Sequence, residues 1–210
     1  LTYGWGIEKN WRYTEQLERA LKEEYNVEVI NIGVNGDQSE DILNKIQRFL
    51  PELNPDLIVY AFCANDFLPS GMGQYSRKLG LPISEKSKNY LNKKLRSFQV
   101  LDGGLKKFLI KSGFGVDFYD DILQNVSQYQ SRFKSDMVKI NKVTTDNGLP
   151  PVIGLITDVG AFYGSRGHRV GLIAKKLMEE AGIDVIEPDL FYKDYNGKYF
   201  SISKFEGHPD

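Results

Sequence analysis

The chain has 210 residues, of which 41% are hydrophobic and 12% aromatic, as is typical of one folded domain and not of a disordered tail. Its 27 Lys and Arg nearly balance 28 Asp and Glu, for a formal net charge of -1, so no overall field attracts nucleic acid or an anionic membrane. A single cysteine, Cys63, excludes an intramolecular disulfide and metal clusters of the paired-cysteine type.

The first third of the chain is predicted to alternate helices with buried strands. Apolar residues recur at helical spacing over residues 11–25, WRYTEQLERALKEEY, which indicates an amphipathic helix. The β-branched run VEVINIGVNG, residues 27–36, predicts a buried strand that opens into a loop. Ser39 begins a second predicted helix that Pro51 closes, and DLIVYAF, residues 56–62, is the next apolar strand.

The character of the sequence changes over residues 68–121, which we interpret as a helical insertion within the domain. Glycines are followed here by the stretch KKLRSFQVLDGGLKKFLIK at residues 93–111, in which basic residues alternate with groups of apolar ones. One hypothesis is a helical pair that packs on the domain surface. The other is a lid that covers the substrate or contacts a lipid surface, because basic amphipathic helices can lie on lipid.

Regular alternation returns after the insertion. A helix is predicted over residues 131–147, the strand PVIGLIT over 151–157, a helix over 169–181 and the short strand IDVIEP over 183–188. Together with the first third of the chain, this order predicts a parallel sheet covered on both faces. The ligand site of such a sheet is expected beyond the carboxyl ends of its strands.

Four short blocks carry residues suited to acyl chemistry: LTYG at residues 1–4, NIGVNG at 31–36, CANDF at 63–67 and EGHPD at 206–210. In this order they resemble the sequence blocks of the SGNH/GDSL hydrolase family. The resemblance covers nearly the whole chain and implies a flavodoxin-like, three-layer α/β/α sandwich with a central parallel sheet. The resemblance also implies that residues 1–210 form one domain that is incomplete at both ends. In that family a Gly-Asp-Ser motif leads directly into a segment like LTYGWG, so the nucleophilic serine is expected immediately before Leu1.

The same resemblance implies roles for residues of this chain. Gly36, with Gly33 as the competing assignment, would donate its backbone N–H to an oxyanion, and Asn65 would add its side-chain amide. His208 would be the base that a serine nucleophile requires. The other histidine, His168, is expected at the solvent-exposed start of a helix.

Two positions depart from the family pattern. Cys63 stands where the family usually has glycine, and we expect it to act as a small buried hydrophobe. The position three residues before His208, where the family commonly has its acid, is Phe205. We therefore assign Glu206 to orient His208. The alternatives are Asp210, Glu187 or a backbone carbonyl.

The predicted reaction is acyl transfer through a covalent acyl-serine, without a metal or an organic cofactor. With water as acceptor the enzyme would be an acylesterase, a lipase or a carbohydrate O-deacetylase acting on a small-molecule ester or an acylated glycan or lipid. With an alcohol as acceptor it would be an O-acyltransferase, and a degenerate, non-catalytic binding module is the alternative from another class.

Other protein classes fit the sequence less well. The GxSxG of α/β-hydrolases does not occur, nor does the GxGxxG or GK[ST] of nucleotide-binding domains. No nucleic-acid partner is implied, and no apolar run approaches the roughly 20 residues of a membrane span. Compartment and oligomeric state stay open.

Overall fold

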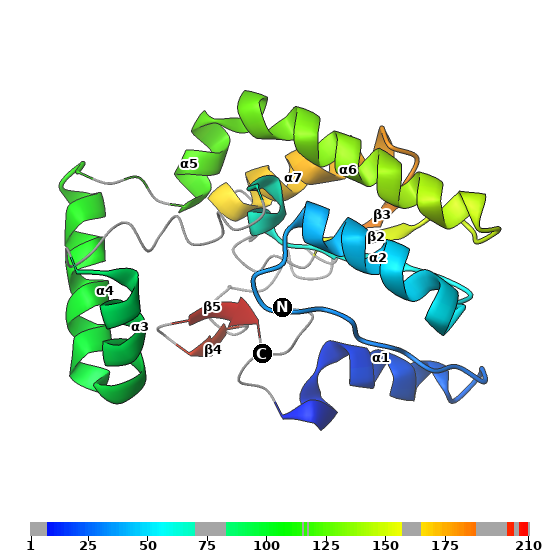
Figure 1. Ribbon diagram of the computed structural model, residues 1–210, viewed down its shortest axis with the longest axis horizontal. Helices are drawn as coiled ribbons and strands as arrows, with labels where there is room; N and C mark the ends of the chain where they lie inside the picture. Colours follow the sequence, from blue (N-terminus) through cyan, green and yellow to red (C-terminus); the bar gives the residue numbers. More distant parts are fainter. Residues whose placement is uncertain are drawn as a thin grey trace.

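The centre of the fold is a parallel sheet, seen in a computed structural model that describes residues 8–69, 83–114, 116, 118–156, 165–187, 201–203 and 206–209. Its strands are β1 (Val59–Phe62), β2 (Ile153–Ile156) and β3 (Asp184–Ile186), in the order β1-β2-β3 (Figure 1). Ile153 of β2 pairs with Val59 on one side and with Asp184 on the other. The predicted parallel α/β sheet is confirmed.

Three helices pack together over this sheet and form the core with it. They are α2 (Ser39–Leu53), α6 (Val126–Asp146) and α7 (Arg166–Glu179). α7 contacts β2 and β3, and α6 lies between α7 and α2. Burial of each large apolar side chain contributes roughly 1.5–3 kcal/mol. The fully buried apolar side chains of the core include Phe62, Phe67, Phe133, Ile140 and Met178.

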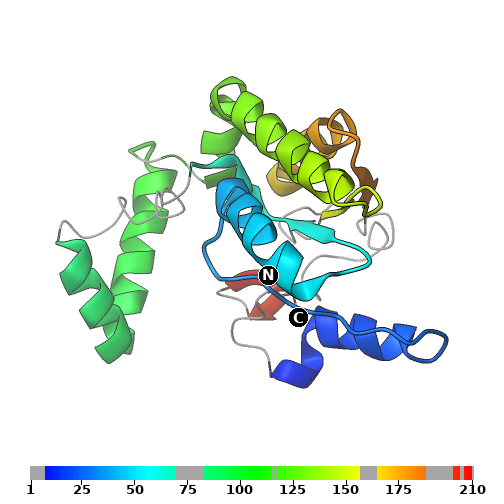
Figure 2. The same cartoon turned by 45° about the vertical axis from the view of Figure 1, so that its right-hand side comes forward.

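The first helices lie apart from this layer. η1 (Lys9–Trp11) is a short 3-10 turn, and α1 (Tyr13–Leu21) follows it. In both views α1 lies at the opposite end of the molecule from α6 (Figures 1 and 2). The helix predicted over residues 11–25 is thus formed, and is shorter than its apolar pattern.

The strand predicted over residues 27–36 is wrong. Residues 26–34 adopt no regular secondary structure, and the Ile30 side chain is 49% exposed. An extended segment becomes a strand only when its backbone bonds to a neighbouring strand, and the described parallel sheet consists of β1, β2 and β3 alone. An apolar run therefore predicted the extended character of this segment, but not its partner.

The end predicted for α2 at Pro51 is also wrong. Pro51 lies inside the helix, which continues to Leu53 and ends where Asn54 takes the left-handed conformation, with φ 41°. The Asn54 N–H bonds the carbonyl of Leu50 at 3.0 Å. Pro51 costs the helix the one backbone bond that its missing N–H would have made, but the helix continues past it, and the left-handed residue sets the actual stop.

Residues 83–114 form a separate helical hairpin. α3 (Glu85–Lys94) and α4 (Arg96–Lys111) pack on each other and stand to one side of the sheet in both views, in green at the left (Figures 1 and 2). The chain returns to the body at α5 (Phe118–Gln124), which packs on α7 and buries Ile122 completely.

Near its end the chain forms a small antiparallel hairpin of β4 (Ser201–Ser203) and β5 (Glu206–Pro209). Ser201 pairs with Pro209, and Ser203 with Glu206. In both views this hairpin lies beside the segment that leads into α2 (Figures 1 and 2). None of the described helices combines the length and apolar character needed to cross a membrane.

Candidate active site

The turn that follows β1 is built around a buried carboxylate. Directly after Cys63 the chain enters η2 (Ala64–Phe67), a 3-10 helix that contains the Asn-Asp pair. The Asp66 carboxylate accepts hydrogen bonds from the Cys63 N–H at 3.0 Å and from the Tyr60 hydroxyl at 2.8 Å. Because Asp66 is buried, these two donors provide the polar contacts that a buried carboxylate requires.

Cys63 fits this turn without backbone strain. Its φ is −130° and its ψ is 148°, ordinary extended values for any L-residue. The position therefore does not need the glycine that the SGNH/GDSL pattern usually has there. Cys63 is half-buried and forms no disulfide, so it is less enclosed than the buried hydrophobe predicted from the sequence.

Asn65, on this turn, reaches the loop that precedes α2. Its side-chain amide donates to the backbone carbonyl of Asp37 at 2.7 Å. The Asp37 carboxylate in turn accepts from the Val34 N–H at 3.0 Å and pairs with Lys45. Gly36 lies between these anchors with φ 92°, a conformation that side chains other than glycine rarely adopt. The structure therefore brings the loop of Gly36 and the side chain of Asn65 together.

A second set of side chains, from α6 and α2, stabilises η2. Arg132 of α6 donates to the carbonyls of Phe67 and Asp66, at 2.6 and 3.2 Å. Ser39 donates its hydroxyl to the Asp136 carboxylate at 2.7 Å. From the sequence, Ser39 was predicted only as a helix start, and Arg132 and Asp136 were not predicted to contribute. The sequence did contain a signal for these two residues: Arg132 and Asp136 are four residues apart, a spacing that allows an ion pair, on a helix face that is otherwise apolar.

The proposed base and acid belong to β5. Glu206 and His208 are two positions apart in this strand. The structure describes their backbone, whereas their side chains, like Phe205 and Asp210, lie outside the described residues. Their roles therefore remain predictions.

Two other residues considered from the sequence lie in described segments. Glu187 is paired with Lys175, and this hydrogen bond raises the pKa of the lysine. His168 is the third residue of α7 and is half-buried, and its backbone N–H donates to the Ser165 hydroxyl at 3.0 Å. Glu187 thus already has a cationic partner. His168 stands at a helix start, as predicted, but it is half-buried and not solvent-exposed as the prediction had it.

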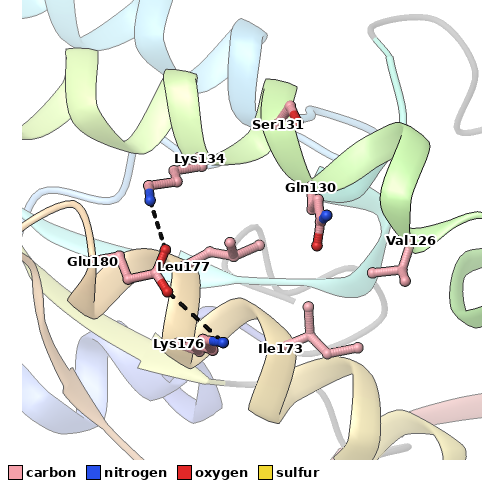
Figure 3. Close-up of a pocket in the computed structure, with 8 residues that line it drawn as sticks. All are labelled: Val126, Gln130, Ser131, Lys134, Ile173, Lys176, Leu177 and Glu180. Carbon is pink, nitrogen blue, oxygen red and sulfur yellow. Dashed lines mark hydrogen bonds and ion pairs between the residues drawn. The ribbon is translucent and has the colours of Figure 1, made fainter.

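A cavity of roughly 390 Å³ lies elsewhere, between α6 and α7 (Figure 3). Its wall includes Ile173 and Leu177, together with Glu180 between two lysines. Glu180 pairs with Lys134 at 2.6 Å and with Lys176 at 3.9 Å, and the hydrogen bond from Lys134 lowers the pKa of Glu180. None of the site residues predicted from the sequence lines this cavity.

The described residues contain no group of three or more His, Cys, Asp or Glu side chains placed to hold a metal ion. The donors described at the end of β1 are the Asn65 side-chain amide, bonded to the Asp37 carbonyl, and the Cys63 backbone N–H, bonded to the Asp66 carboxylate. Such groups stabilise developing negative charge on an oxygen atom. The arrangement therefore suits chemistry in which an oxyanion forms.

Tyr60→Phe is expected to change how stability depends on pH. Burial, and then the Asp66 carboxylate, raise the pKa of Tyr60 well above its ordinary value. In the unfolded chain this tyrosine ionises at about pH 10, whereas in the folded chain it ionises only at a higher pH. The stability that follows from this raised pKa of Tyr60 is therefore fully present below about pH 10 and is lost as the pH rises further. Urea unfolding from about pH 8 to about pH 11 should show a shallower alkaline decline in the variant.

The matched control for this prediction is Tyr25→Phe, at an exposed tyrosine. It should leave the alkaline decline unchanged. Tyr60→Phe should also cost roughly 1.5–3 kcal/mol at neutral pH, because the buried Asp66 carboxylate loses one donor. Identical pH profiles for the wild type and Tyr60→Phe would contradict the assignment.

Comparison with known proteins gives one match. A model of the GDSL-like lipase/acylhydrolase family matches residues 1–210. No curated protein and no solved structure matches the chain.

Proposed function

The chain belongs to the GDSL-like lipase/acylhydrolase family, and from this premise we propose that it hydrolyses carboxylic esters through a covalent acyl-serine intermediate. The substrate class is a small-molecule ester or an acylated glycan or lipid. The observation that carries the proposal is the hydrogen bond from Asn65, in the CANDF block, to Asp37, which directly follows the NIGVNG block.

The oxyanion of the tetrahedral intermediate is assigned to Gly36 and Asn65. An asparagine amide has two N–H donors, and the Asp37 carbonyl takes one from Asn65. The second N–H and the backbone N–H of Gly36 are the donors we assign to the oxyanion. The bond to Asp37 fixes the amide before substrate arrives, so little reorganisation is needed as negative charge develops.

The nucleophile is assigned to a serine immediately before Leu1, from the order of the sequence blocks. β1 is an edge strand of the described sheet, and Val59 on it is exposed. Parallel strands present their carboxyl ends at the same edge of a sheet. A strand that ends in this serine and pairs with β1 would therefore bring the hydroxyl toward Asn65, which follows β1 by three residues.

His208 is assigned as the base, with Glu206 as the acid that orients it. The serine Oγ attacks the ester carbonyl carbon while its proton passes to His208. Collapse of the intermediate breaks the C–O bond, and His208 returns the proton to the leaving alcohol. Water then attacks the acyl-serine by the same route, and the carboxylic acid leaves. The β4–β5 hairpin supports this assignment because it lies beside the segment that leads into α2 (Figures 1 and 2).

Labelling with a fluorophosphonate probe tests this function. The protein is used as its gene encodes it, with any residues that precede Leu1, and the modified peptide is mapped by mass spectrometry. Labelling of a serine immediately before Leu1, together with turnover of p-nitrophenyl acetate, is the expected result. Labelling of a serine within residues 1–210 would overturn the assigned nucleophile. A folded protein that neither labels nor turns over ester would favour the non-catalytic binding module.

The same assay distinguishes the hydrolase from an O-acyltransferase. When an alcohol acceptor is added with the ester, a hydrolase continues to release mainly free acid. An acyltransferase instead accumulates the new ester. If the new ester is the main product, the protein is an O-acyltransferase and the proposed hydrolase function is wrong.

A further inference from the structure

Charge is distributed unevenly between the α3–α4 hairpin and the rest of the chain. Residues 85–111 contain eight Lys and Arg and two Asp and Glu, whereas the rest of the chain contains 19 and 26. The balanced overall charge therefore conceals a strongly basic hairpin on an acidic body. This basic hairpin is also the part of the molecule that stands away from the sheet (Figures 1 and 2).

The outward face of α4 combines large apolar side chains with basic ones. Leu101 and Phe108 are 66% and 63% exposed, and their separation of seven residues, about two turns, puts them on one side of the helix. Phe114, just beyond the helix end, is 80% exposed. Phe98 and Asp102 are buried on the adjoining side of α4, so that side is the one that packs. We call the face that contains Leu101, Phe108, Lys107 and Lys111 the α4 face.

The basic residues of the α4 face have no ion-pair partner among the described residues. Lys107 and Lys111 are exposed, as is Arg96 at the start of the helix. On the body of the protein, in contrast, lysines such as Lys134 and Lys142 pair with nearby carboxylates. The charges of the α4 face are therefore available to an external anion.

From this pattern we infer that the α4 face docks on the surface of an anionic lipid bilayer. A helix with apolar side chains beside lysines lies in the interfacial plane, with its apolar side chains among the lipids and its lysines at the anionic headgroups. A second copy of this chain is a poorer occupant, because a symmetric contact would place two basic hairpins against each other. The inference concerns binding alone and does not rest on the esterase assignment.

Vesicle sedimentation of the whole protein tests the inference. The probes are vesicles of phosphatidylcholine alone and of an equimolar mixture of phosphatidylcholine and phosphatidylglycerol. We expect binding to the mixed vesicles, little binding to phosphatidylcholine alone, and weaker binding as salt is added. Absence of binding to the mixed vesicles, or equal binding to both kinds, would overturn the inference.

Two paired variants separate the apolar and basic contributions. Leu101→Ser with Phe108→Ser is expected to weaken binding by roughly tenfold or more. Lys107→Glu with Lys111→Glu is expected to weaken it by at least about tenfold. The control is Leu172→Ser, an exposed leucine on α7, which should bind as the wild type does. All four substituted side chains of the hairpin are exposed, and circular dichroism checks the fold. Wild-type binding by both paired variants would disprove docking through the α4 face.

Discussion

Replacing His208 with alanine is expected to lower kcat/KM for ester hydrolysis by about 10⁴- to 10⁶-fold. A serine hydroxyl is a weak nucleophile near neutral pH, and it needs a base within hydrogen-bonding reach to take its proton. The same group must return the proton to the leaving alcohol, so its loss slows both halves of the reaction. Losses of about this size follow removal of the histidine from a serine triad. The measurement is hydrolysis of p-nitrophenyl acetate by the protein as its gene encodes it.

His168→Ala is the control, because the sequence contains only these two histidines. His168 is half-buried at the start of α7 and is assigned no role in the reaction, so the variant should keep activity within a few fold. If His168→Ala loses most of its activity and His208→Ala keeps it, then His168 is the base and His208 is not. Fluorophosphonate labelling should fall together with turnover in His208→Ala, because both require the activated serine.

Glu206→Gln, in the same assay, decides the identity of the acid. Phe205 occupies the position where the family commonly has it, and Glu187 is already paired with Lys175. Loss of turnover in Glu206→Gln would establish a triad that uses an acid two residues before the histidine. Unchanged turnover would leave His208 to act with a backbone carbonyl or with Asp210.

The sheet could be predicted where apolar runs coincide with strands that find partners. Residues 56–62, 151–157 and 183–188 contain β1, β2 and β3, because buried parallel strands require continuous apolar sequence. Residues 27–36 have the same kind of sequence and form no strand. Whether a segment pairs depends on the neighbouring strand as much as on the segment itself, and a local sequence pattern does not specify that neighbour.

Motif resemblance predicted residues of the candidate site, but not the contacts that hold them. Motif resemblance pointed to Gly36 and Asn65, and the structure shows how their segments meet, through the Asp37 carbonyl. The contacts that hold η2 from α6 join residues far apart in the sequence, as in the bond from Arg132 to the Phe67 carbonyl. Such contacts depend on how helices pack, so the sequence alone did not reveal them.

Overall composition does not show where the charge of the chain lies. A net charge of -1 indicated no attraction to an anionic membrane, yet the α3–α4 hairpin is basic and stands on its own. The distance over which charges act in salt is about 10 Å at 0.1 M, so the local charge of a protruding element matters more than the total. The charge of each structural element is therefore the informative quantity for this chain.

Asn65→Ala is expected to lower kcat by about 10²- to 10³-fold with little change in KM, as when a single oxyanion donor is removed. The substrate carbonyl is neutral in the ground state, so the lost hydrogen bond matters mainly after the oxyanion has formed. The variant also leaves the Asp37 carbonyl without the Asn65 amide, which should cost about 1 kcal/mol of stability.

Asn125→Ala separates the catalytic loss from the structural one. Asn125 is half-buried, like Asn65, and donates its amide to the backbone carbonyl of Asp121 at 3.0 Å. Its amide also donates to the Asp121 carboxylate at 3.0 Å, so its replacement removes two hydrogen bonds, at the junction of α5 and α6. We therefore expect a decrease in the free energy of unfolding at least as large as in Asn65→Ala and a kcat within a few fold of the wild type. If kcat falls equally in both variants, Asn65 acts only through stability; if it falls in Asn65→Ala alone, the amide interacts with the transition state.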